Sequence, residues 1–275
     1  MTFMQTQTPE TMGVVGGWVF LNKKGYEPIL HQALPAGVTN PTYRVDLQAC
    51  LFHLIRRAYT RHPANVAHHI VESGLFKIGS KETMVLYLDG QPAKEKTMTH
   101  DRRKKAQADA VGKAQKLLVH FEERITKSQR VRKQLFASIG KQIRKAFYWS
   151  LDDRKEFASF LEQNGWRVRI ASTEADVKIA RDTVPGDIVV TTDSDLLFYG
   201  TINTVIRPIS KGRFLVYRIE DILNKLQLSR VQWTVLGIVS RNDYNHNVPS
   251  LGVESNYKII SGLGSEGKLE ERSLW

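Results

Sequence analysis

Asp193 and Asp195 follow a short apolar run, residues 188–190. An uninterrupted β-branched run is typical of a strand that is buried on both faces of a parallel sheet. Open α/β sheets place their sites at the carboxyl ends of such strands. Two carboxylates this close repel each other, so a divalent cation is the simplest partner. The alternative is that one aspartate caps the next helix and the other is solvated, and this stretch alone does not decide between the two.

Four more acidic residues occupy comparable positions. Asp46 and Asp89 each end a predicted buried strand, whereas Glu174 and Asp176 open a predicted helix, where capping and the helix dipole are the alternative explanation. The carboxyl ends of parallel strands share one edge, so we expect all of these side chains to form one oxygen-rich pocket. Such a pocket suits Mg²⁺ or Mn²⁺ rather than Zn²⁺. Two such ions about 4 Å apart can activate water and stabilise the leaving oxygen of a phosphodiester.

The elements that would position these residues alternate between strands and helices. Strands are expected at 43–47, 84–88, 166–170, 188–190, 203–206 and 214–217, the last two as a pair. Helices are expected at 48–59, 64–73, 97–149, 152–163, after 172, and at 219–226, 231–239 and 254–261. Residues 12–40 read as a flexible start and a mixed segment. This order predicts an α/β fold with a mostly parallel, wound sheet flanked by helices.

The segment 97–149 reads as two long helices with a weak break near His120, and Asp152 is expected to cap the helix that follows. It is longer than an ordinary crossover, so we expect residues 94–149 to project from the sheet as an arch. Residues 94–145 contain 16 Lys and Arg against 5 Asp and Glu, an excess of 11 in a chain whose net charge is +12. Such a local basic block indicates a polyanion partner, most often nucleic acid, although a solvated helical face is the plainer explanation.

Composition excludes several classes of protein. With 275 residues and 41% apolar content, the chain can form one large packed domain, and no apolar run approaches the roughly 20 residues of a membrane helix. Its first twelve residues lack Lys and Arg and match no secretory or transit peptide. Cys50 is the single cysteine, so an internal disulfide is excluded. We expect a monomer inside the cell, nuclear in a eukaryote.

With these residues in view, the chain resembles the flap endonuclease family, structure-specific 5′ nucleases with a PIN-like catalytic core. The resemblance covers Gly13 to about Ser261. Its motifs are Val45-Asp46, Leu88-Asp89-Gly90-Gln91-Pro92, Thr173-Glu174-Ala175-Asp176, Thr192-Asp193-Ser194-Asp195 and Asn242-Asp243-Tyr244. The resemblance implies a two-metal, Mg²⁺-dependent hydrolysis of flapped or branched DNA. The metal ligands that it implies are Asp46, Asp89, Glu174, Asp176, Asp193, Asp195 and Asp243, with Asp176 standing where many relatives have Glu.

The resemblance also assigns roles outside the acidic set. Lys96 and Arg103, seven and fourteen residues after Asp89, match the basic pair that family enzymes direct at the scissile phosphate, and a spacing of seven puts both on one side of a helix. Phe52 matches an aromatic residue that stacks on a nucleobase, although a core role is equally compatible with its position. Further nucleic-acid contacts are expected at Arg102, Lys104, Lys105, Arg130, Arg132, Lys133 and Gly252.

Residues 231–261 resemble the family's helix–two-turn–helix element, which binds duplex DNA, often with K⁺. Here the usual Gly-x-Gly-Pro turn reads Ser250-Leu251-Gly252-Val253, so the first glycine and the proline are absent. The expected domain therefore spans 13–261, between an extension at 1–12 and a flexible tail at 262–275, and no clamp-binding motif follows it. Two alternatives remain open: a PIN-like nuclease for single-stranded DNA or RNA, and a non-catalytic nucleic-acid-binding scaffold.

Overall fold

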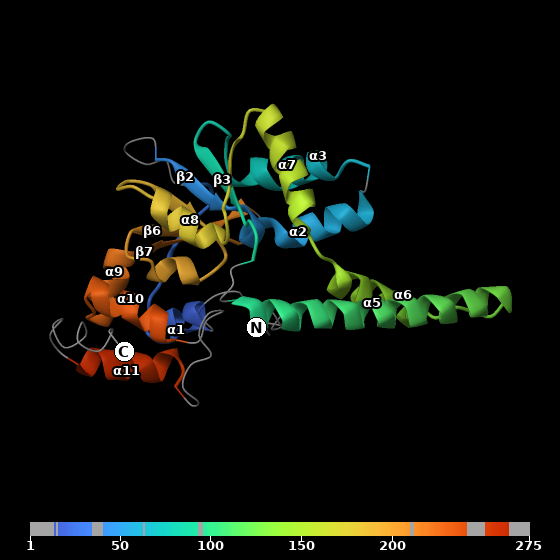
Figure 1. Ribbon diagram of the computed structural model, residues 1–275. Helices are drawn as coiled ribbons and strands as arrows, with labels where there is room; N and C mark the ends of the chain where they lie inside the picture. Colours follow the sequence, from blue (N-terminus) through green and yellow to red (C-terminus); the bar gives the residue numbers. More distant parts are fainter. Residues whose placement is uncertain are drawn as a thin grey trace.

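A seven-stranded mixed sheet forms the centre of the molecule (Figure 1). The computed structural model describes residues 14, 16–34, 41–62, 64–92, 96–209, 212–240 and 251–263. The strands are β1 Ile29–His31, β2 Tyr43–Asp46, β3 Met84–Leu88, β4 Arg167–Ile170, β5 Ile188–Val190, β6 Thr204–Pro208 and β7 Phe214–Arg218. Their order is β1-β7-β6-β5-β2-β3-β4, and the five strands β6, β5, β2, β3 and β4 run parallel to one another. The predicted mostly parallel α/β sheet is confirmed, as is the pairing of β6 with β7, which the structure shows to be antiparallel.

Helices cover both faces of the sheet. The first face packs against α2 Leu47–Arg61, α3 Val66–Ile70, a π-helical turn Val71–Leu75, α4 Phe76–Ile78 and α7 Leu151–Gln163. The second face packs against α1 Gly17–Lys23, α8 Ala175–Asp182, the 3₁₀ turn Asp195–Phe198, α9 Ile219–Leu226, α10 Arg230–Val239 and α11 Val253–Gly262. Side chains alternate between the two cores along each strand: in β3, Leu86 joins the first core and Tyr87 the second. This alternation places Arg44, Tyr87 and the two strand-ending aspartates on the second face.

The insertion forms a helical hairpin that projects from the body (Figure 1). Its helices are α5 Thr97–Thr126 and α6 Lys133–Ala146, which pack against each other through contacts such as the edge-to-face pair of Phe121 and Phe136. The break predicted near His120 is wrong, because the 30-residue α5 continues through it. No glycine or proline interrupts the chain there, and the turn falls later, at residues 127–132.

Two other local expectations were wrong. Ser150, not Asp152, caps α7, and its hydroxyl and the Asp153 carboxylate exchange hydrogen bonds with each other's backbone. The segment 12–40 contains α1 and the edge strand β1, neither of which the sequence pattern indicated. Strand β1 has three residues and is held by its antiparallel pairing with β7, nearly two hundred residues later in the chain. None of the helices in the described residues has the length and apolar character needed to cross a bilayer.

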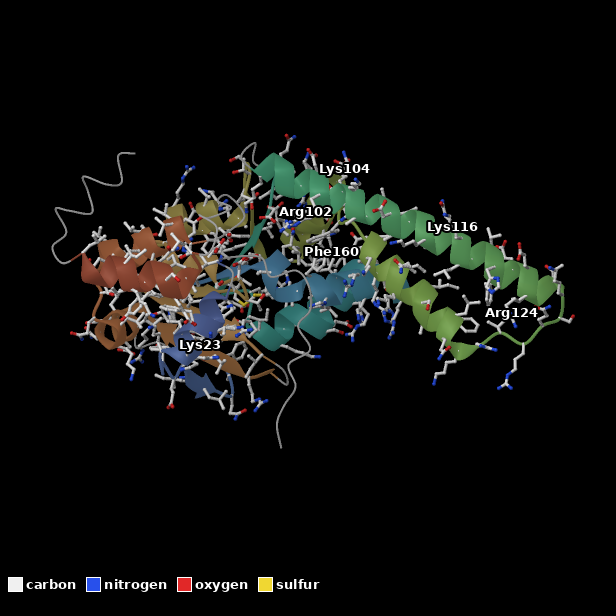
Figure 2. All side chains as sticks on the ribbon, turned by 90° about the horizontal axis from the view of Figure 1, so that it is seen from below. Lys23, Arg102, Lys104, Lys116, Arg124 and Phe160 are labelled. Atoms are coloured by element: carbon white, nitrogen blue, oxygen red, sulfur yellow. The ribbon has the colours of Figure 1, made fainter. Side chains whose placement is uncertain are left out.

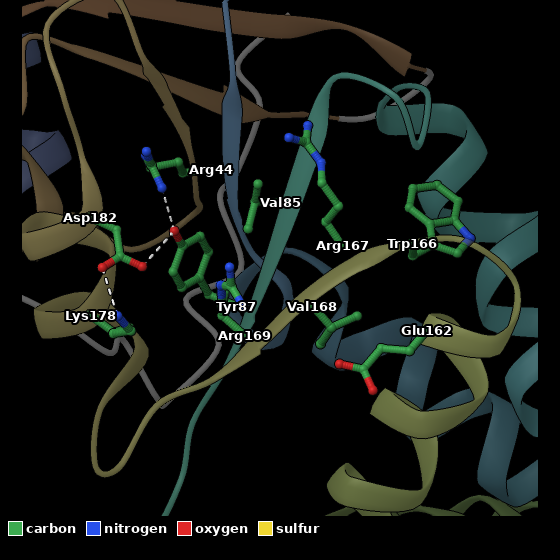
Figure 3. Close-up of a pocket in the computed structure, with 10 residues that line it drawn as sticks. All are labelled: Arg44, Val85, Tyr87, Glu162, Trp166, Arg167, Val168, Arg169, Lys178 and Asp182. Atoms are coloured by element: carbon green, nitrogen blue, oxygen red, sulfur yellow. Dashed lines mark hydrogen bonds and ion pairs between the residues drawn. The ribbon is translucent and has the colours of Figure 1, made fainter.

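Helix α8 leaves part of the second face uncovered beside β3 and the edge strand β4. A cavity of about 780 Å³ opens there, between Arg44, Tyr87 and Lys178 on one side and Trp166, Arg167 and Arg169 on the other (Figure 3). One wall is an ion-pair network. Asp187 accepts from the Arg44 guanidinium at 2.6 Å, and Tyr87 Oη lies 2.5 Å from Arg44 Nη1. The Tyr87 hydroxyl donates to Asp182 at 3.1 Å, and Lys178 pairs with the same carboxylate at 2.7 Å.

Candidate active site

The carboxyl end of β2 holds a buried carboxylate in a fixed position. Asp46 is the last residue of β2 and also the N-cap of α2, so its Oδ1 accepts the Ala49 amide at 3.0 Å. Its Oδ2 accepts the hydroxyl of Thr191, the residue after β5, also at 3.0 Å. Asp46 is 5% exposed. Capping therefore explains one oxygen of this group, while the residue itself lies at the sheet edge where the strands end.

The turn after β5 places Asp193 and Asp195 together. Thr191 Oγ1 accepts the Asp193 amide, and Asp193 Oδ1 accepts the Asp195 amide, both at 3.0 Å. The 3₁₀ turn starting at Asp195 then leads the chain away. The Val14 amide donates to the Asp195 carboxylate, so the segment before α1 is bound to this turn. Asp193 and Asp195 are thus held by local hydrogen bonds, and Asp195 also by Val14, which is distant in the sequence.

The carboxyl end of β3 is joined to the start of α8. Asp89 Oδ1 accepts the Ala175 amide at 2.8 Å, and the Gly90 amide donates to the Thr173 carbonyl at 2.6 Å. A Cβ at Gly90 would collide with the carbonyl oxygen of Ala171, so only glycine allows this close approach. The junction places Glu174 and Asp176, the N-cap and first turn of α8, beside the end of β3.

These elements converge on one edge of the sheet, which we call the acidic rim. Carboxylate oxygens of Asp176, Asp193 and Asp195 lie within 4.8 Å of one another. Asp46, Asp89 and Glu174 border this cluster. Of the seven expected metal ligands, only Asp243 cannot be placed, because it lies outside the described residues.

The electrostatics of the rim are those of crowded, buried carboxylates. Burial, then the charges of Asp193, Asp46 and Asp89, raises the pKa of Asp176 well above its ordinary value. Burial, followed by the charge of Asp89, raises the pKa of Asp46 to about 7. The pKa of Asp89 is also raised, chiefly by burial, although the Ala175 amide opposes this shift. Ionising the whole set therefore costs free energy unless a cation is added.

The donor set of the rim fits a hard divalent cation. The cluster consists of carboxylate oxygens only, which are the ligands that Mg²⁺ and Mn²⁺ prefer. The charge of Asp46 acts on the thiol of Cys50, which donates to the Val190 carbonyl at 3.5 Å. Burial raises the pKa of this thiol well above its ordinary value, so it is not a thiolate ligand.

Two basic side chains lie at the rim. Lys96, the N-cap of α5, is 9% exposed and pairs with Glu174 at 2.8 Å. Arg154 on α7 is 6% exposed, donates to the Gly90 carbonyl at 3.2 Å and reaches the Gln48 side chain at 3.4 Å. Sequence reasoning missed Arg154, because it sits among charged residues at a helix start and reads as solvated. The arginine at an otherwise apolar core position of α7, between Leu151 and Phe157, was the available signal.

Most of the remaining expected residues lie along the hairpin. Arg103 is half-buried on α5, two turns after Lys96, while Arg102, Lys104 and Lys105 are exposed on the same turns. Figure 2 shows Arg102 and Lys104 on this part of α5. Arg130, Arg132 and Lys133 are exposed at the far turn of the hairpin, and Gly252 is the N-cap of α11.

Phe52 is half-buried rather than free for stacking. Its ring centroid lies 6.0 Å from that of Phe147, at the base of the hairpin, and the Arg56 guanidinium lies 5.8 Å from it. Phe147 follows the end of α6, so the contact packs α2 against the base of the hairpin. A packing role for Phe52 is thus evident, and stacking on a base remains a prediction.

Comparison with known proteins identifies the fold. No protein-family model matches the chain, and no curated protein matches it in sequence. The catalytic core of Rad2 in complex with a DNA substrate is similar with a TM-score of 0.56 at 17% identity, over 94% of this chain and 70% of that one. Human GEN1 in complex with Holliday junction DNA is similar with a TM-score of 0.58 at 21% identity, over 96% of this chain and 59% of the GEN1 chain. Flap endonuclease-1 from Methanococcus jannaschii is similar with a TM-score of 0.53 at 17% identity, over 84% of this chain and 73% of that one.

The protein therefore has a PIN-like α/β fold. In this fold it is similar to flap endonuclease-1, Rad2 and GEN1, which confirms, at the level of the fold, the resemblance to the flap endonuclease family expected from the motifs. The chain spans less than two thirds of the GEN1 chain. At these sequence identities the likeness defines the fold alone.

Proposed function

We propose that this protein is a Mg²⁺-dependent, structure-specific 5′ nuclease that hydrolyses phosphodiester bonds in flapped or branched DNA. The observation that carries the proposal is the convergence of Asp176, Asp193 and Asp195 within 4.8 Å at the carboxyl ends of the strands. The raised pKa of Asp176, and a cluster that consists of carboxylates alone among the described residues, favour a site for hard divalent cations. An intracellular location, nuclear in a eukaryote, belongs to the same proposal.

Each rim residue has a distinct part in this proposal. Asp89, Glu174 and Asp176 would hold one ion, while Asp176, Asp193, Asp195 and Asp243 would hold the other, with Asp46 bordering both. When bound, such ions supply a nucleophilic water at neutral pH and neutralise charge on the phosphate. The protein contributes fixed ligands: hydrogen bonds hold the carboxylates of Asp46, Asp89 and Asp193 in place before substrate arrives.

Lys96 is one of the two basic side chains described at the acidic rim. Its ammonium pairs with Glu174 at 2.8 Å and is held in a buried position at the start of α5. We propose that it stabilises negative charge that develops on the scissile phosphate, with Arg103 two turns further along α5 acting on the same strand. The other basic residues of the hairpin would attract the nucleic acid electrostatically.

DNA is the favoured substrate because the solved neighbours include Rad2 with a DNA substrate and GEN1 with Holliday junction DNA. The first test compares cleavage of a 5′ flap, a nicked duplex, a single DNA strand and an RNA strand, each with Mg²⁺ and with chelator. We expect Mg²⁺-dependent cleavage, fastest on the flap. Preference for a single strand or RNA would instead support the other PIN-like activity that the altered turn at Ser250 leaves open.

The second test concerns the metal site itself. We expect Asp193→Asn to abolish cleavage while DNA binding, measured by fluorescence anisotropy in Ca²⁺, stays within a few-fold of wild type. Asp187→Asn is the matched control, since it removes a buried carboxylate from the opposite end of the same strands and should leave cleavage by folded protein intact. Full activity of Asp193→Asn would rule out the two-metal assignment, and inactivity of the wild type on every substrate would support a non-catalytic scaffold.

A further inference from the structure

The turn that joins α5 and α6 is a defined structure with a high density of positive charge. We call its five basic residues the hairpin tip; they are Arg124, Lys127, Arg130, Arg132 and Lys133. Between residues 124 and 133 the chain contains no Asp or Glu. Nothing within the turn itself therefore neutralises these charges.

Hydrogen bonds hold the tip in one conformation. The Arg124 guanidinium donates twice to the Arg130 carbonyl, at 2.8 and 3.3 Å, and so spans the turn. The Gln129 amide donates to the Arg124 carbonyl at 2.8 Å, and Ser128 takes a left-handed backbone conformation with φ 52°. The basic side chains thus project from a braced turn rather than from a loose loop, which lowers the entropic cost of binding a ligand there.

The tip is far from the acidic rim. Helix α5 begins beside Lys96, which pairs with Glu174 at the rim, and extends for 30 residues. At 1.5 Å per residue this is a length of about 45 Å. Figure 1 shows the hairpin projecting from the body, and Figure 2 shows Arg124 near its far end. A phosphate that is cleaved at the rim cannot reach the tip.

The hairpin is rigid enough to keep that distance. Ala110 and Ala114 of α5 and Ile139 of α6 are buried in the seam between the two helices. The rings of Phe121 and Phe136 meet edge to face with centroids 5.2 Å apart, close to the tip. The two antiparallel helices therefore support each other along the projecting part.

We propose that the hairpin tip binds the phosphate backbone of a duplex arm of the substrate, remote from the cleavage site. A length of about 45 Å corresponds to about 13 base pairs at 3.4 Å per step. Residues 124–133 contain no aromatic side chain. The flanking rings of Phe121 and Phe136 pack against each other, although Phe136 is 54% exposed, whereas surfaces for single strands offer several aromatic rings on which bases stack. Charge without stacking favours a duplex. The inference rests on the proposed function only in that the partner is a nucleic acid.

The test compares DNA arms of different lengths. In the tip variant, Arg130, Arg132 and Lys133 are each replaced by Gln. In the matched control, the exposed body residues Lys77, Lys155 and Lys225 are each replaced by Gln, so the net charge changes equally. Binding to labelled branched DNA is measured by anisotropy in Ca²⁺, with each duplex arm in turn shortened from 20 to 8 base pairs. Circular dichroism checks that both variants are folded.

We expect wild type and the control to bind more tightly when one particular arm is long, and the tip variant to lose that gain. On the long arm, the slope of log Kd against log salt should fall by roughly 2 to 3 in the tip variant, as for three lost phosphate contacts. With the arm at 8 base pairs, the tip variant and wild type should bind equally well.

Three outcomes would overturn the proposal. Equal losses with short and long arms would place the contact near the rim. No loss on either arm would make the tip a solvated surface. A loss that persists when the long arm is single-stranded would identify a strand-binding site instead. Because cleavage is not measured, the result stands or falls independently of the nuclease activity.

Discussion

Charged side chains form ion pairs near the amino-terminal ends of strands β2 and β3, whereas like charges crowd together at the carboxyl-terminal ends. On β2, Arg44 and Asp46 are two residues apart and therefore point to the same face of the sheet. Tyr87 on β3 and Asp89, which directly follows β3, are also two residues apart. At the amino-terminal end, Arg44 pairs with Asp187, and Lys178 pairs with Asp182. At the carboxyl-terminal end, carboxylates face one another, and the pKa values of Asp46 and Asp176 are raised by burial and by their neighbours' charges.

This difference distinguishes structural charge from functional charge. Buried ions that serve the fold are neutralised within the chain, because leaving one unpaired costs several kcal/mol. At the rim, Lys96 pairs with Glu174, but burial and neighbouring carboxylates still raise the pKa values of Asp46, Asp89 and Asp176. Ionising the whole rim therefore costs free energy unless a cation is added. Beside the cavity, hydrogen bonds and an ion pair join Arg44, Tyr87, Asp182 and Lys178 (Figure 3).

The largest expected effect comes from Asp176→Asn. Cleavage should fall by at least about a thousandfold, since under the proposed function Asp176 is a ligand of both ions, and its loss would remove several kcal/mol of transition-state stabilisation. The same change should raise the melting temperature of the metal-free protein, because it removes one of several repelling carboxylates. Single-turnover cleavage in Mg²⁺ and calorimetry in EDTA measure the two effects. A metal-free protein that becomes less stable would show that the rim is not electrostatically strained.

Arg44→Met should lower the stability of the fold but leave cleavage intact, the opposite of Asp176→Asn. It leaves Asp187 buried without its partner, which we expect to lower the free energy of unfolding by about 3–5 kcal/mol. Urea denaturation measures this loss. Adding Asp187→Asn in the same chain should recover part of it, and the cleavage rate per folded molecule should stay near wild type at low temperature. Loss of cleavage in a folded Arg44→Met protein would contradict the separation of the two regions.

The two regions should also respond to pH with opposite signs. Because the pKa of Asp46 is raised to about 7 by burial and by Asp89, the metal-free fold binds a proton between about pH 4 and pH 7 that the unfolded chain releases. Its stability should therefore fall as pH rises through this range, by up to about 1.4 kcal/mol per unit for one group. Saturating Mn²⁺ should remove this decline, because the metal favours the ionised carboxylates.

The ionisation of Asp182 should change stability with pH in the opposite direction. Burial opposes its ionisation, but hydrogen bonds from Lys178 and Tyr87 hold its pKa below the ordinary value. Its contribution to stability is therefore present above about pH 4 and is lost as the pH falls below that. Unfolding followed from pH 3 to 8, in EDTA and in Mn²⁺, separates the two trends. Stability in EDTA that rises steadily from pH 4 to 7 would contradict the sign given for the rim.

The smallest expected effect comes from Tyr87→Phe. The change removes the hydroxyl that lies between Arg44 and Asp182, while the buried ring remains. We expect a loss of about 1–2 kcal/mol in the free energy of unfolding, measured in urea, with cleavage unchanged. A larger loss would indicate that the hydroxyl holds the whole network together and is more than one link in it.

The sequence by itself determined the acidic set, the alternation of strands and helices, and the concentration of positive charge in the insertion. These are local properties: β-branched runs bounded by aspartate and glycine, as at Val189 and Asp193, form strands whose ends carry the site. Their convergence also follows from a general rule, since parallel strands must end at one edge.

Only the tertiary structure decided which charges are paired. Arg44 finds Asp187, and Arg154 finds the Gly90 carbonyl, across 143 and 64 residues of chain. Strand β1 likewise exists through its pairing with β7, and the turn of the hairpin lies beyond His120 because the packing of α6 supports a longer α5. Residue patterns report local propensity, whereas the free energy of a buried charge or an edge strand depends on partners that only folding brings near.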